Sequence, residues 1–316
     1  MNLGTPREPS TEAVRTFLAE FLADPAVVDL PAWLWKPILH RIILKSRPRR
    51  VAELYRAIWT AEGSPLEVDT RRIASGLESL FDAHTQVRWA YRYGEPSLPS
   101  CLEEILDLES TEIVVLPLYA QRTSSTTGTV VDQATALARQ LGIEGRTRVA
   151  FLEPDDRGYV EANAARLRAA LQGESWEPEH VLLSFHGIPA RYDRREGEQY
   201  SRDCARTANA IIDQLEWEPE RATLCYQSKF GPERWLTPST ASLLGSLPAR
   251  GVRRIAVMTP GFFTEGLETI EEIGIRGQEV FFAAGGSHFL RVPASSDHPA
   301  LLGSLARLAV GGLDRS

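Results

Sequence analysis

The sequence predicts an α/β fold with two Rossmann-like lobes, each with a parallel sheet flanked by helices, and an active-site cleft between the lobes. Short apolar segments rich in β-branched residues alternate with longer segments of helical periodicity, which is typical of βαβ units with right-handed crossovers. Two segments, 113–129 and 254–270, also repeat one order of features: strand, proline, aromatic residue, polar loop and helix. A chain of 316 residues is long enough for two such lobes.

The individual elements follow from this alternation. The expected strands are 87–93, which has the weakest pattern, 113–118, 148–152, 181–185, 222–226 and 255–259. The expected helices are 65–82, 129–141, 158–172, 200–216, 233–247 and 267–283, and a last helix is expected to begin near Asp297, a residue suited to an N-cap. The charged segment 141–148, which contains two glycines, marks a boundary, so we expect lobes of residues 1–147 and 148–316.

The composition excludes several classes of protein. The 35 basic and 42 acidic residues give a formal net charge of −7, whereas a general nucleic-acid binder carries a basic excess. No apolar run is long enough for a transmembrane helix, and the first residues lack the pattern of a signal peptide. The three cysteines form no CxxC pair, and the phosphate-loop, dinucleotide-binding, hydrolase-elbow and HExxH signatures are absent. We therefore expect a cytoplasmic globular protein.

Residues 14–56 differ from the rest of the chain. Apolar residues recur at helical spacing from Val14 to Leu22, and between Lys36 and Arg56 seven basic residues accompany one acid. Tryptophan beside lysine and arginine is typical of a segment that lies on a membrane surface. The residues offered to such a surface are Trp33, Trp35, Ile38, Ile42 and Ile43 for lipid, and Lys36, Arg41, Lys45, Arg47, Arg49 and Arg50 for headgroups. The alternative is a helical hairpin over the core with a solvated basic face.

Among the six histidines, His186 has the most informative setting. It follows the expected strand 181–185, and Gly187 and Pro189 indicate a turn directly after it. Ligands in open α/β sheets bind beyond the carboxyl ends of strands. An imidazole there can accept a proton near neutral pH or bind a divalent metal. The alternative is a histidine that is hydrogen-bonded within a turn.

Acidic residues gather after the expected strand 255–259. On an α-helix, Glu265, Glu268 and Glu272 would share an arc of about 60° on one face. Oxygen ligands in a row at this end of a sheet suggest a path for a hydrated divalent cation. The alternative is a solvated acidic first turn, which the helix dipole stabilises.

Two further polar segments follow expected strands. In YQSKFGPERWLTPST (226–240), Ser228 and Lys229 could contact an anion together with a helix N-terminus, and Trp235 is expected on that helix. The hydroxyl-rich segment LYAQRTSSTTGT (118–129) predicts substrate contact, and packing of Tyr119 with capping by its serines and threonines is the alternative.

The motifs along nearly the whole chain resemble the ferrochelatase family. The matching segments, in order, are NLGTP (2–6), EFLADPAVVDLP (20–31), AIWTAEGSPL (57–66), YRYGEPS (91–97), LPLYAQRTSSTTGT (116–129), SFHGIPARY (184–192), YQSKFGPERWLTP (226–238), PGFFTEGLETIEEI (260–273) and AAGGSHFLRVPA (283–294). Each is weak alone, but nine in order are specific. The glutamate segment is similar to the Gram-negative form of the family.

This resemblance implies insertion of Fe²⁺ into protoporphyrin IX to form protohaem, by an ATP-independent, single-chain lyase of haem biosynthesis. It implies that His186 and Glu268 are catalytic and lie on opposite sides of the porphyrin, and that both, with Glu272 and Glu265, handle the metal. The residues implied to contact the porphyrin are Leu3, Arg92, Tyr119, Ser125 and Trp235. Leu3 stands where related coproporphyrin enzymes carry a tyrosine, which favours protoporphyrin.

Several positions depart from the family pattern. Gly266 replaces a histidine that many members carry two residues before Glu268, Arg122 replaces a usual tyrosine, and Ser239 stands where LTPYT is typical. Members also carry a short apolar strand before NLGTP, and its loss would expose a sheet edge. The cysteine-bearing C-terminal extension is missing, so we expect no iron–sulfur cluster and no prosthetic group, with Fe²⁺ as a substrate.

Two other functions remain open on the sequence. One is a porphyrin-binding carrier without turnover, and the other is a tetrapyrrole chelatase of related fold that inserts cobalt or nickel. The segments SFHGIP and LETIEEI favour ferrochelatase over both. The expected partners are protoporphyrin IX, Fe²⁺ and the inner face of the cytoplasmic membrane, without nucleic acid.

Overall fold

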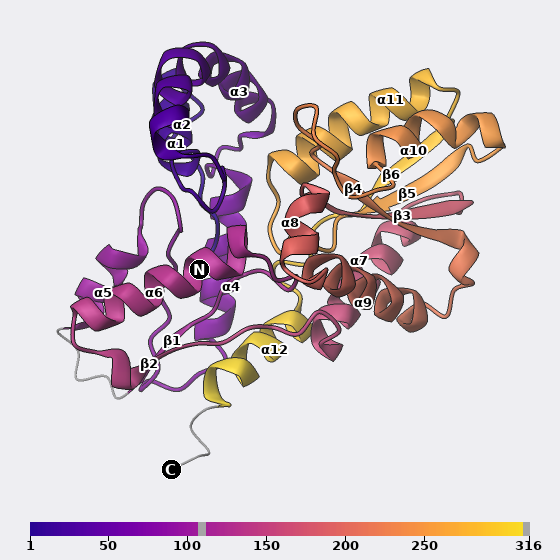
Figure 1. Cartoon of the computed structure of the whole chain (residues 1–316). Helices are drawn as coiled ribbons and strands as arrows, with labels where there is room; N and C mark the ends of the chain where they lie inside the picture. Colours follow the sequence, from indigo (N-terminus) through magenta and orange to yellow (C-terminus); the bar gives the residue numbers. More distant parts are fainter. Residues whose placement is uncertain (107–111, 312–316) are drawn as a thin grey trace. The chain divides into compact units, whose positions relative to one another are not determined.

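The computed structural model describes residues 1–106 and 112–311 and divides the chain into two compact units (Figure 1). One unit contains Met1–Leu118, Ser124–Phe151 and the chain from Leu308, and the other contains Tyr119–Thr123 and Leu152–Arg307. The main division lies between Phe151 and Leu152, and the boundary expected at 147 and 148 stays a prediction. Tyr119–Thr123 and the chain from Leu308 each belong to a different unit from the residues next to them in sequence. A single boundary cannot describe this division. The last five residues of the expected second lobe, 312–316, lie outside the described residues.

The first unit is mainly helical around a small parallel sheet. Its strands are β1 (Ile113–Val115) and β2 (Thr147–Val149). Its helices are α1 (Thr11–Phe21), α2 (Ala32–Ile38), α3 (Leu44–Ile58), α4 (Pro65–Glu78), α5 (Leu98–Leu106) and α6 (Thr129–Gln140), with π-helices η1 (Leu39–Ile43) and η2 (Ser124–Gly128) and a 3₁₀ turn η3 (Glu144–Arg146). Helix α1 begins where the Ser10 side chain accepts a hydrogen bond from Ala13 N–H, and it buries Val14, Phe17 and Leu18 while packing on α3.

The strand expected at 87–93 is wrong. Tyr91 makes isolated parallel pairings with Asn2 and with Ser97. Its N–H donates to Pro96 O at 2.7 Å, and the next residue, Arg92, donates to Asn2 O at 2.8 Å. The partner of this segment changes from one residue to the next, so no regular ladder extends along it.

The second unit carries a four-stranded parallel sheet in the order β4-β3-β5-β6. The strands are β3 (His180–His186), β4 (Ala222–Gln227), β5 (Arg254–Met258) and β6 (His288–Arg291). Its helices are α7 (Arg157–Gln172), α8 (Ala190–Arg195), α9 (Gln199–Gln214), α10 (Thr240–Ser246), α11 (Gln278–Ala283) and α12 (Pro299–Val310), whose end from Leu308 belongs to the first unit, with short turns η4 (Pro219–Arg221) and η5 (Pro248–Arg250) and a π-helix η6 (Leu267–Gly277). The predicted α/β class with parallel sheets flanked by helices is confirmed.

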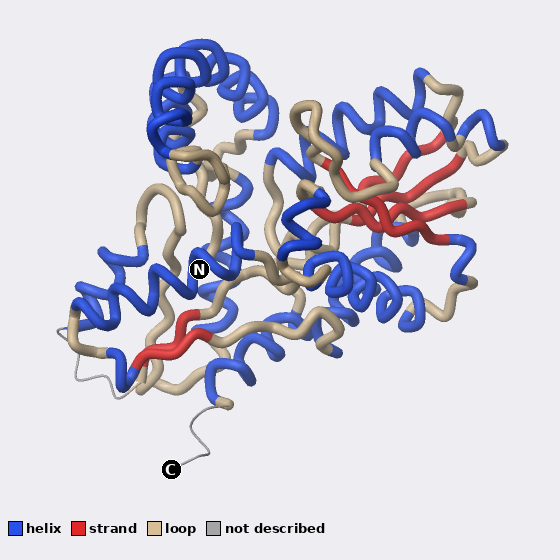
Figure 2. The backbone as a smooth tube through the Cα atoms, viewed as in Figure 1, coloured by secondary structure: helices blue, strands red, loops and turns tan. Residues whose placement is uncertain are grey.

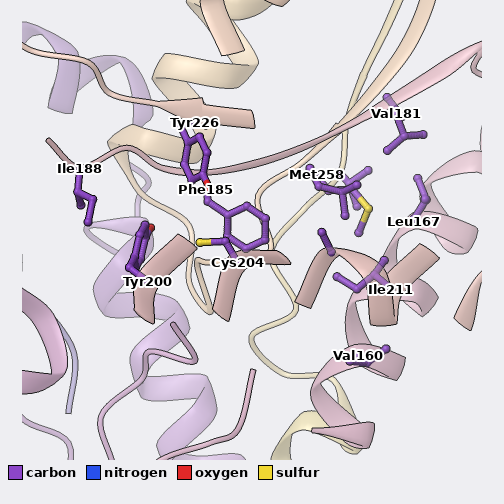
Figure 3. Packing of buried hydrophobic residues seen from close by; sticks show 14 residues of the cluster. Val160, Leu167, Val181, Phe185, Ile188, Tyr200, Cys204, Ile211, Tyr226 and Met258 are labelled. Atoms are coloured by element: carbon purple, nitrogen blue, oxygen red, sulfur yellow. The ribbon is translucent and has the colours of Figure 1, made fainter. Parts of the chain in front are cut away.

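Helices cover both faces of this sheet (Figure 2). Alternate residues of β3 point to opposite faces, so Leu183 and Phe185 pack against α7 and α9, whereas Leu182 packs against α10, η6 and α11. Figure 3 shows Phe185 close to Tyr200 and Cys204 of α9 within the first of these cores. The same alternation assigns Ser184 and His186 to the η6 side of the sheet.

Two helix predictions require correction. The helix expected at 233–247 begins only at Thr240, and Trp235 lies in the preceding loop. The backbone of that loop bonds elsewhere: Leu236 N–H donates to Ile188 O, and Tyr226 N–H donates to Pro238 O. The helix expected at 267–283 forms as η6 followed by α11, and η6 has the wider i→i+5 hydrogen-bonding pattern of a π-helix.

The repeated order of features at 113–129 and 254–270 is present in the structure. In each case a strand, β1 or β5, leads through a loop to a π-helix, η2 or η6, which continues directly into an α-helix. In the described part of the chain, no helix is long and apolar enough to cross a membrane.

Candidate active site

The carboxyl ends of β3 and β5 lie side by side at a point where the chain changes direction across the sheet. From β3 the chain passes through α8 and α9 to β4 on one side, and from β5 it passes through η6 and α11 to β6 on the other. Ligands of open α/β sheets bind beyond the carboxyl ends of strands at such a switch point. The topology therefore places His186, at the end of β3, and the segment after β5 at the position where a ligand is expected.

His186 is held by its backbone and by one ring nitrogen. It pairs in register with Gln227 of β4, and its carbonyl accepts a hydrogen bond from Tyr200 Oη at 2.6 Å. The ring Nδ1 lies 2.7 Å from Gly187 O. Because a carbonyl only accepts hydrogen bonds, this contact places the proton of the neutral ring on Nδ1 and leaves a lone pair on Nε2. The half-buried imidazole can thus take a proton or a metal at Nε2.

The residue after His186 must be small. A Cβ at Gly187 would lie 2.6 Å from Gln227 O and 3.2 Å from Trp235 Cε3. Glycine therefore allows the turn after β3 to approach β4 and the indole of Trp235 closely. Gly187 and Trp235 also line a small cavity of about 50 Å³, together with Tyr226, Gln227, Lys229, Leu236, Thr237 and Ser239.

Glu268 lies in the first turn of η6, and Gln227 fixes that turn. Gln227 Nε2 donates to Glu268 O at 2.7 Å, while Gln227 Oε1 accepts from Ser184 Oγ at 2.7 Å. Burial raises the pKa of the Glu268 carboxyl, the charges of Glu272 and Glu271 add to this effect, and His186 opposes it. Glu268 therefore keeps its proton to a higher pH than an ordinary glutamate does.

Glu272, one turn further along η6, is bound by a single residue of the β4 end. Ser228 donates its N–H to Glu272 Oε1 at 2.7 Å and its Oγ–H to Oε2 at 2.6 Å. The sequence left open an anion contact at Ser228. Within the second unit, the anion is the chain's own Glu272 carboxylate.

The expectation that Glu265 shares a helix face with the other two glutamates is wrong, because η6 begins at Leu267. Glu265 Oε1 accepts from Arg291 Nη1 at 2.6 Å and from Ala294 N–H at 3.0 Å, and Oε2 accepts from Thr269 Oγ1. These contacts join the start of η6 to β6. The carboxylate of Glu265 is thus already paired with Arg291, and its metal-binding role stays a prediction.

A third acidic residue of η6 has a structural partner. Glu271 is buried, and Arg276 donates to its two oxygens at 2.7 and 2.8 Å. The two residues are five apart in sequence, a spacing that a π-helix brings close to one face because its hydrogen bonds join residues i and i+5. Sequence reasoning that assumed 100° per residue could not find this pair.

No group of three or more histidine, cysteine, aspartate or glutamate side chains in residues 1–106 and 112–311 is arranged to hold a metal ion. His186, Glu268 and Glu272 offer separate donors, from the end of β3 and from η6.

Comparison with known proteins decides the family. The family model Ferrochelatase matches residues 1–312. A ferrochelatase of Bordetella pertussis is 40% identical over 98% of this chain and 85% of its own length, and one of Edwardsiella ictaluri is 42% identical over 94% of this chain and 92% of its own. The chain belongs to the ferrochelatase family. The resemblance found in the sequence motifs is therefore confirmed, as is the classification as a lyase.

Solved structures share the fold at low sequence identity. The SirB protein of Bacillus subtilis with Fe³⁺ has 17% identity and a TM-score of 0.54, covering 78% of this chain and 90% of its own. A sirohydrochlorin chelatase SirB from Bacillus subtilis subspecies spizizenii, in complex with cobalt, has 14% identity and a TM-score of 0.57, covering 81% of this chain and 93% of its own. These two structures support the fold.

The structure accounts for one of two departures from the ferrochelatase pattern, Arg122, and leaves the other, Gly266, without a structural reason. Arg122 donates its backbone N–H to Asp203 Oδ2 at 3.1 Å, and its Nε lies 3.5 Å from the same oxygen, so this arginine ties segment 119–123 to α9. At Gly266, a Cβ would meet only Glu268 Oε2, at 3.4 Å. The backbone there is extended, with φ −170°, so a side chain has room. Nothing in the structure requires glycine at this position.

The residues expected to contact porphyrin are divided between the units. Tyr119 and Trp235 belong to the second unit, and Trp235 pairs through its backbone with Pro189. Leu3, Arg92 and Ser125 belong to the first unit. Leu3 is half-buried, and its carbonyl accepts from Tyr93 N–H at 2.9 Å, while Ser125 lies in η2. Arg92 Nη2 donates to Asp24 Oδ2 at 2.5 Å.

Proposed function

We propose that this member of the ferrochelatase family inserts Fe²⁺ into protoporphyrin IX in haem biosynthesis. The observation that carries the proposal is the proximity of His186 and Glu268 at the switch point of the second unit. His186, with a lone pair on Nε2, ends β3, and the half-buried Glu268 opens the π-helix that follows β5. The imidazole also lowers the pKa of Glu268 electrostatically, against the larger effect of burial.

Metal insertion requires two protons to leave the pyrrole nitrogens as the metal enters. His186 Nε2 is a suitable proton acceptor, since Gly187 O already holds the Nδ1 proton. Glu268 and Glu272 offer oxygen ligands along η6 that can replace the water of a hydrated cation stepwise. A macrocycle held bent by the protein would expose its nitrogen lone pairs to the incoming metal. We assign both His186 and Glu268 to this exchange of protons for metal.

Two of the residues expected to contact the substrate, Arg92 and Trp235, have a buried side-chain nitrogen without a hydrogen-bond partner, Nε and Nε1 respectively. Other buried polar atoms of the described residues share this property, Arg122 Nε and Arg166 Nε among them. A buried donor without a partner costs free energy, on the order of 1–3 kcal/mol, so an acceptor that reaches it would be stabilising.

Arg92 is a suitable partner for a porphyrin carboxylate. Tyr119 and Ser125, in the hydroxyl-rich segment 118–129, are proposed to contact the porphyrin as well. Leu3 offers no oxygen ligand to a metal, which favours protoporphyrin as the substrate.

Iron is a substrate in this proposal, and no prosthetic group takes part. The three cysteines lie on three different elements: Cys101 on α5, Cys204 on α9 and Cys225 on β4. All three are buried and free. Because a cluster needs thiolates gathered around one site, we propose that the protein carries no iron–sulfur cluster.

An anaerobic assay with protoporphyrin IX and Fe²⁺, followed by absorbance, tests the function. Turnover to haem supports the proposal. Tight porphyrin binding without turnover would instead indicate a carrier. Insertion of Co²⁺ or Ni²⁺ into a different tetrapyrrole, in preference to Fe²⁺ into protoporphyrin, would indicate a chelatase of the other type.

We also propose that the protein is cytoplasmic and docks peripherally on an anionic membrane surface through α2, η1 and α3. Trp33 is 78% exposed and Ile42 is 59% exposed, and α2 has no buried residue. The exposed basic residues beside them are Lys36, Arg41, Lys45, Arg49 and Arg50. Exposed tryptophan and isoleucine among cations match an interfacial segment. Protoporphyrin and haem dissolve poorly in water, so docking would let them exchange with lipid.

The structure changes which tryptophan should carry this docking. Trp35 is half-buried, and its Nε1 donates to Leu22 O at 2.6 Å, so it serves the packing of α2. The test is co-sedimentation with vesicles of mixed phosphatidylcholine and phosphatidylglycerol. Trp33→Ala/Ile42→Ala should abolish sedimentation, whereas Leu80→Ala, at an exposed leucine beyond α4, should bind as wild type. Wild-type protein that stays in the supernatant would overturn the docking proposal.

A further inference from the structure

The contact between Ser228 and Glu272 is unusual because one residue occupies both oxygens of the carboxylate. The backbone N–H binds Oε1 at 2.7 Å, and the hydroxyl binds Oε2 at 2.6 Å. Hydrogen bonds to an ionised acceptor are stronger than neutral ones, and a two-point contact also fixes orientation. The Glu272 side chain is therefore held in one direction, although each oxygen keeps a second lone pair for another partner.

The backbone of Ser228 is strained to make this contact. Its φ is +64°, in the left-handed region that few residues other than glycine adopt. The other non-glycine residues with positive φ in the described chain, Glu198 and Glu216, lie at the two ends of α9, whereas Ser228 directly follows β4. Such strain persists where surrounding contacts fix the conformation.

The support beneath Ser228 is rigid. The preceding residue, Gln227, is buried and pairs in register with His186. Its side chain joins Ser184 Oγ to Glu268 O, and Ser184 Oγ in turn lies 2.7 Å from Thr240 Oγ1. The end of β4 therefore holds η6 at two glutamates four residues apart, by the backbone of Glu268 through Gln227 and by the carboxylate of Glu272 through Ser228.

We propose that Ser228 is a positioning residue for the metal substrate. It orients the Glu272 carboxylate so that the free lone pairs receive a divalent cation and pass it along η6 toward Glu268. This inference rests on the proposed metal insertion and adds a residue to it. Because the contacts of Ser228 are with the Glu272 carboxylate, it acts through Glu272 and before the chemical step.

The test compares Ser228→Ala and Ser228→Gly in the insertion assay with Fe²⁺ anaerobically and with Zn²⁺ in air. Both variants lose the hydroxyl, but only Ser228→Gly also removes the strain that a side chain has at positive φ. Each should raise the KM for metal by about tenfold, since one charge-assisted hydrogen bond is lost. The kcat at saturating metal and the Kd for protoporphyrin should stay within twofold of wild type. Ser246→Ala, an exposed serine on α10, is the matched control and should change nothing.

A double-mutant cycle separates positioning from general structure. In a Glu272→Ala background, Ser228→Ala should have no further effect on the KM for metal, because its partner is already gone. Three results would each overturn the proposal. The effects of Ser228→Ala and Glu272→Ala on the KM for metal could be fully additive, or both Ser228 variants could keep the wild-type KM. The third is a raised KM in Ser228→Ala that returns to the wild-type value in Ser228→Gly. Failure of wild-type protein to insert Fe²⁺ or Zn²⁺ would overturn the proposed function itself.

Discussion

At the scale of single residues, the chemistry of His186 depends on a neighbour that contributes only a carbonyl. Gly187 O holds Nδ1 at 2.7 Å and so selects the tautomer whose free lone pair is on Nε2. Gly187 can do this because it lacks a Cβ, which would collide with Gln227 O. A residue that the sequence marks as a turn former thus also determines which nitrogen can accept a proton.

Replacement of His186 by alanine should abolish insertion and preserve porphyrin binding. A positioned base contributes about 10²–10⁴-fold to a rate, whereas one half-buried imidazole supplies little of the area of a mostly apolar porphyrin site. Turnover is measured as haem formation, and binding as quenching of tryptophan fluorescence. His84→Ala, at an exposed loop histidine, is the control. Retention of more than about a tenth of wild-type turnover, a loss below roughly 1.4 kcal/mol of barrier, would contradict the catalytic role.

The two glutamates of η6 should differ in kinetics. Glu268→Gln should lower kcat by about a hundredfold, because it removes a titratable group at the switch point. Glu272→Gln should mainly raise the KM for metal, by about tenfold, since it acts on the approach of the cation. Steady-state kinetics at varied Fe²⁺ concentration distinguish the two. An equal loss of kcat in both variants, with the KM for metal unchanged, contradicts the path along η6.

At the scale of elements, one ion pair within η6 joins a buried carboxylate, that of Glu271, to the half-exposed guanidinium of Arg276. Glu271 is 3% exposed and binds Arg276 through two hydrogen bonds at i, i+5 spacing. Glu268 and Glu272 lie on the same π-helix as this pair.

Arg276→Ala should destabilise the protein more than removal of both partners does. The single change leaves a buried carboxylate without its cation, at a cost of about 1–2 kcal/mol because Arg276 is half exposed and water can replace it in part, whereas Glu271→Leu/Arg276→Leu removes the buried charge as well. Chemical denaturation measures the free energy of unfolding in each variant. If the double variant is less stable than Arg276→Ala, the unpaired carboxylate of Glu271 is not the main cost of losing the arginine.

The sequence predicts an element well where its hydrophobic periodicity agrees with the turn and capping residues that bound it. The core strands β3, β4 and β5 and the helices α7 and α9 lie within two residues of the expected bounds. Strand β6 has no clear signal in the sequence, because HFLR is a four-residue edge strand with polar residues at both ends and no alternation. The sequence predicts a helix from residue 233, but Pro238 disfavours helical backbone at Thr237, and the loop 233–239 forms long-range hydrogen bonds with strand ends instead.

The candidate site divides in the same way. His186 and Glu268 could be found from strand ends and from family motifs, because their roles are tied to local sequence. The contacts of Glu265 with Arg291 and of Glu272 with Ser228 join segments that are 26 and 44 residues apart. No local pattern encodes such a pairing, and the π-helix that sets the glutamate spacing has no period that a search at 100° per residue can detect.

Glu179 shows how one carboxylate joins two strands and predicts a dependence of stability on pH. Its Oε2 accepts from the N–H groups of Arg253 and Arg254 at 2.7 and 3.0 Å, and these bonds lower the pKa of Glu179. Because the folded-state pKa is below the unfolded value, the stabilisation is present above about pH 4.5 and is lost as pH falls through the lower folded value.

Glu179→Gln should therefore cost stability near neutral pH, on the order of 1 kcal/mol because the side chain is partly solvated, and little at pH 3. Denaturant unfolding across pH 3–7 measures the difference. Glu177→Gln, on the same loop, should lose nothing at either pH. A penalty for Glu179→Gln that stays constant over this range would contradict the role of its ionised form.

At the scale of the whole molecule, charge is unevenly distributed. The chain carries a net charge of −7, yet residues 36–56 contain seven basic residues and one acid. At physiological salt the Debye length is about 8 Å, so distant acidic residues do little to cancel this local charge. A net-acidic protein can thus bind an anionic surface through one segment.

Membrane docking should accordingly be reversible by salt. Each exposed lysine or arginine near an anionic surface contributes about 1 kcal/mol at low salt, and this contribution falls as screening increases. Co-sedimentation should decrease from about 50 mM to about 500 mM NaCl, and vesicles of phosphatidylcholine alone should bind less at every salt concentration. Binding that is independent of both salt and lipid charge would indicate a purely apolar attachment.

The burial of all three cysteines makes the thiols reporters of local opening. Burial raises the pKa of the Cys101, Cys204 and Cys225 thiols, so each is protonated and unreactive in the folded protein. An added disulfide reagent can then label a thiol only when α5, α9 or β4 opens. Labelling followed by mass spectrometry would yield three separate opening rates from the unmodified chain. The same burial protects the three thiols from oxidation and from binding metal ions.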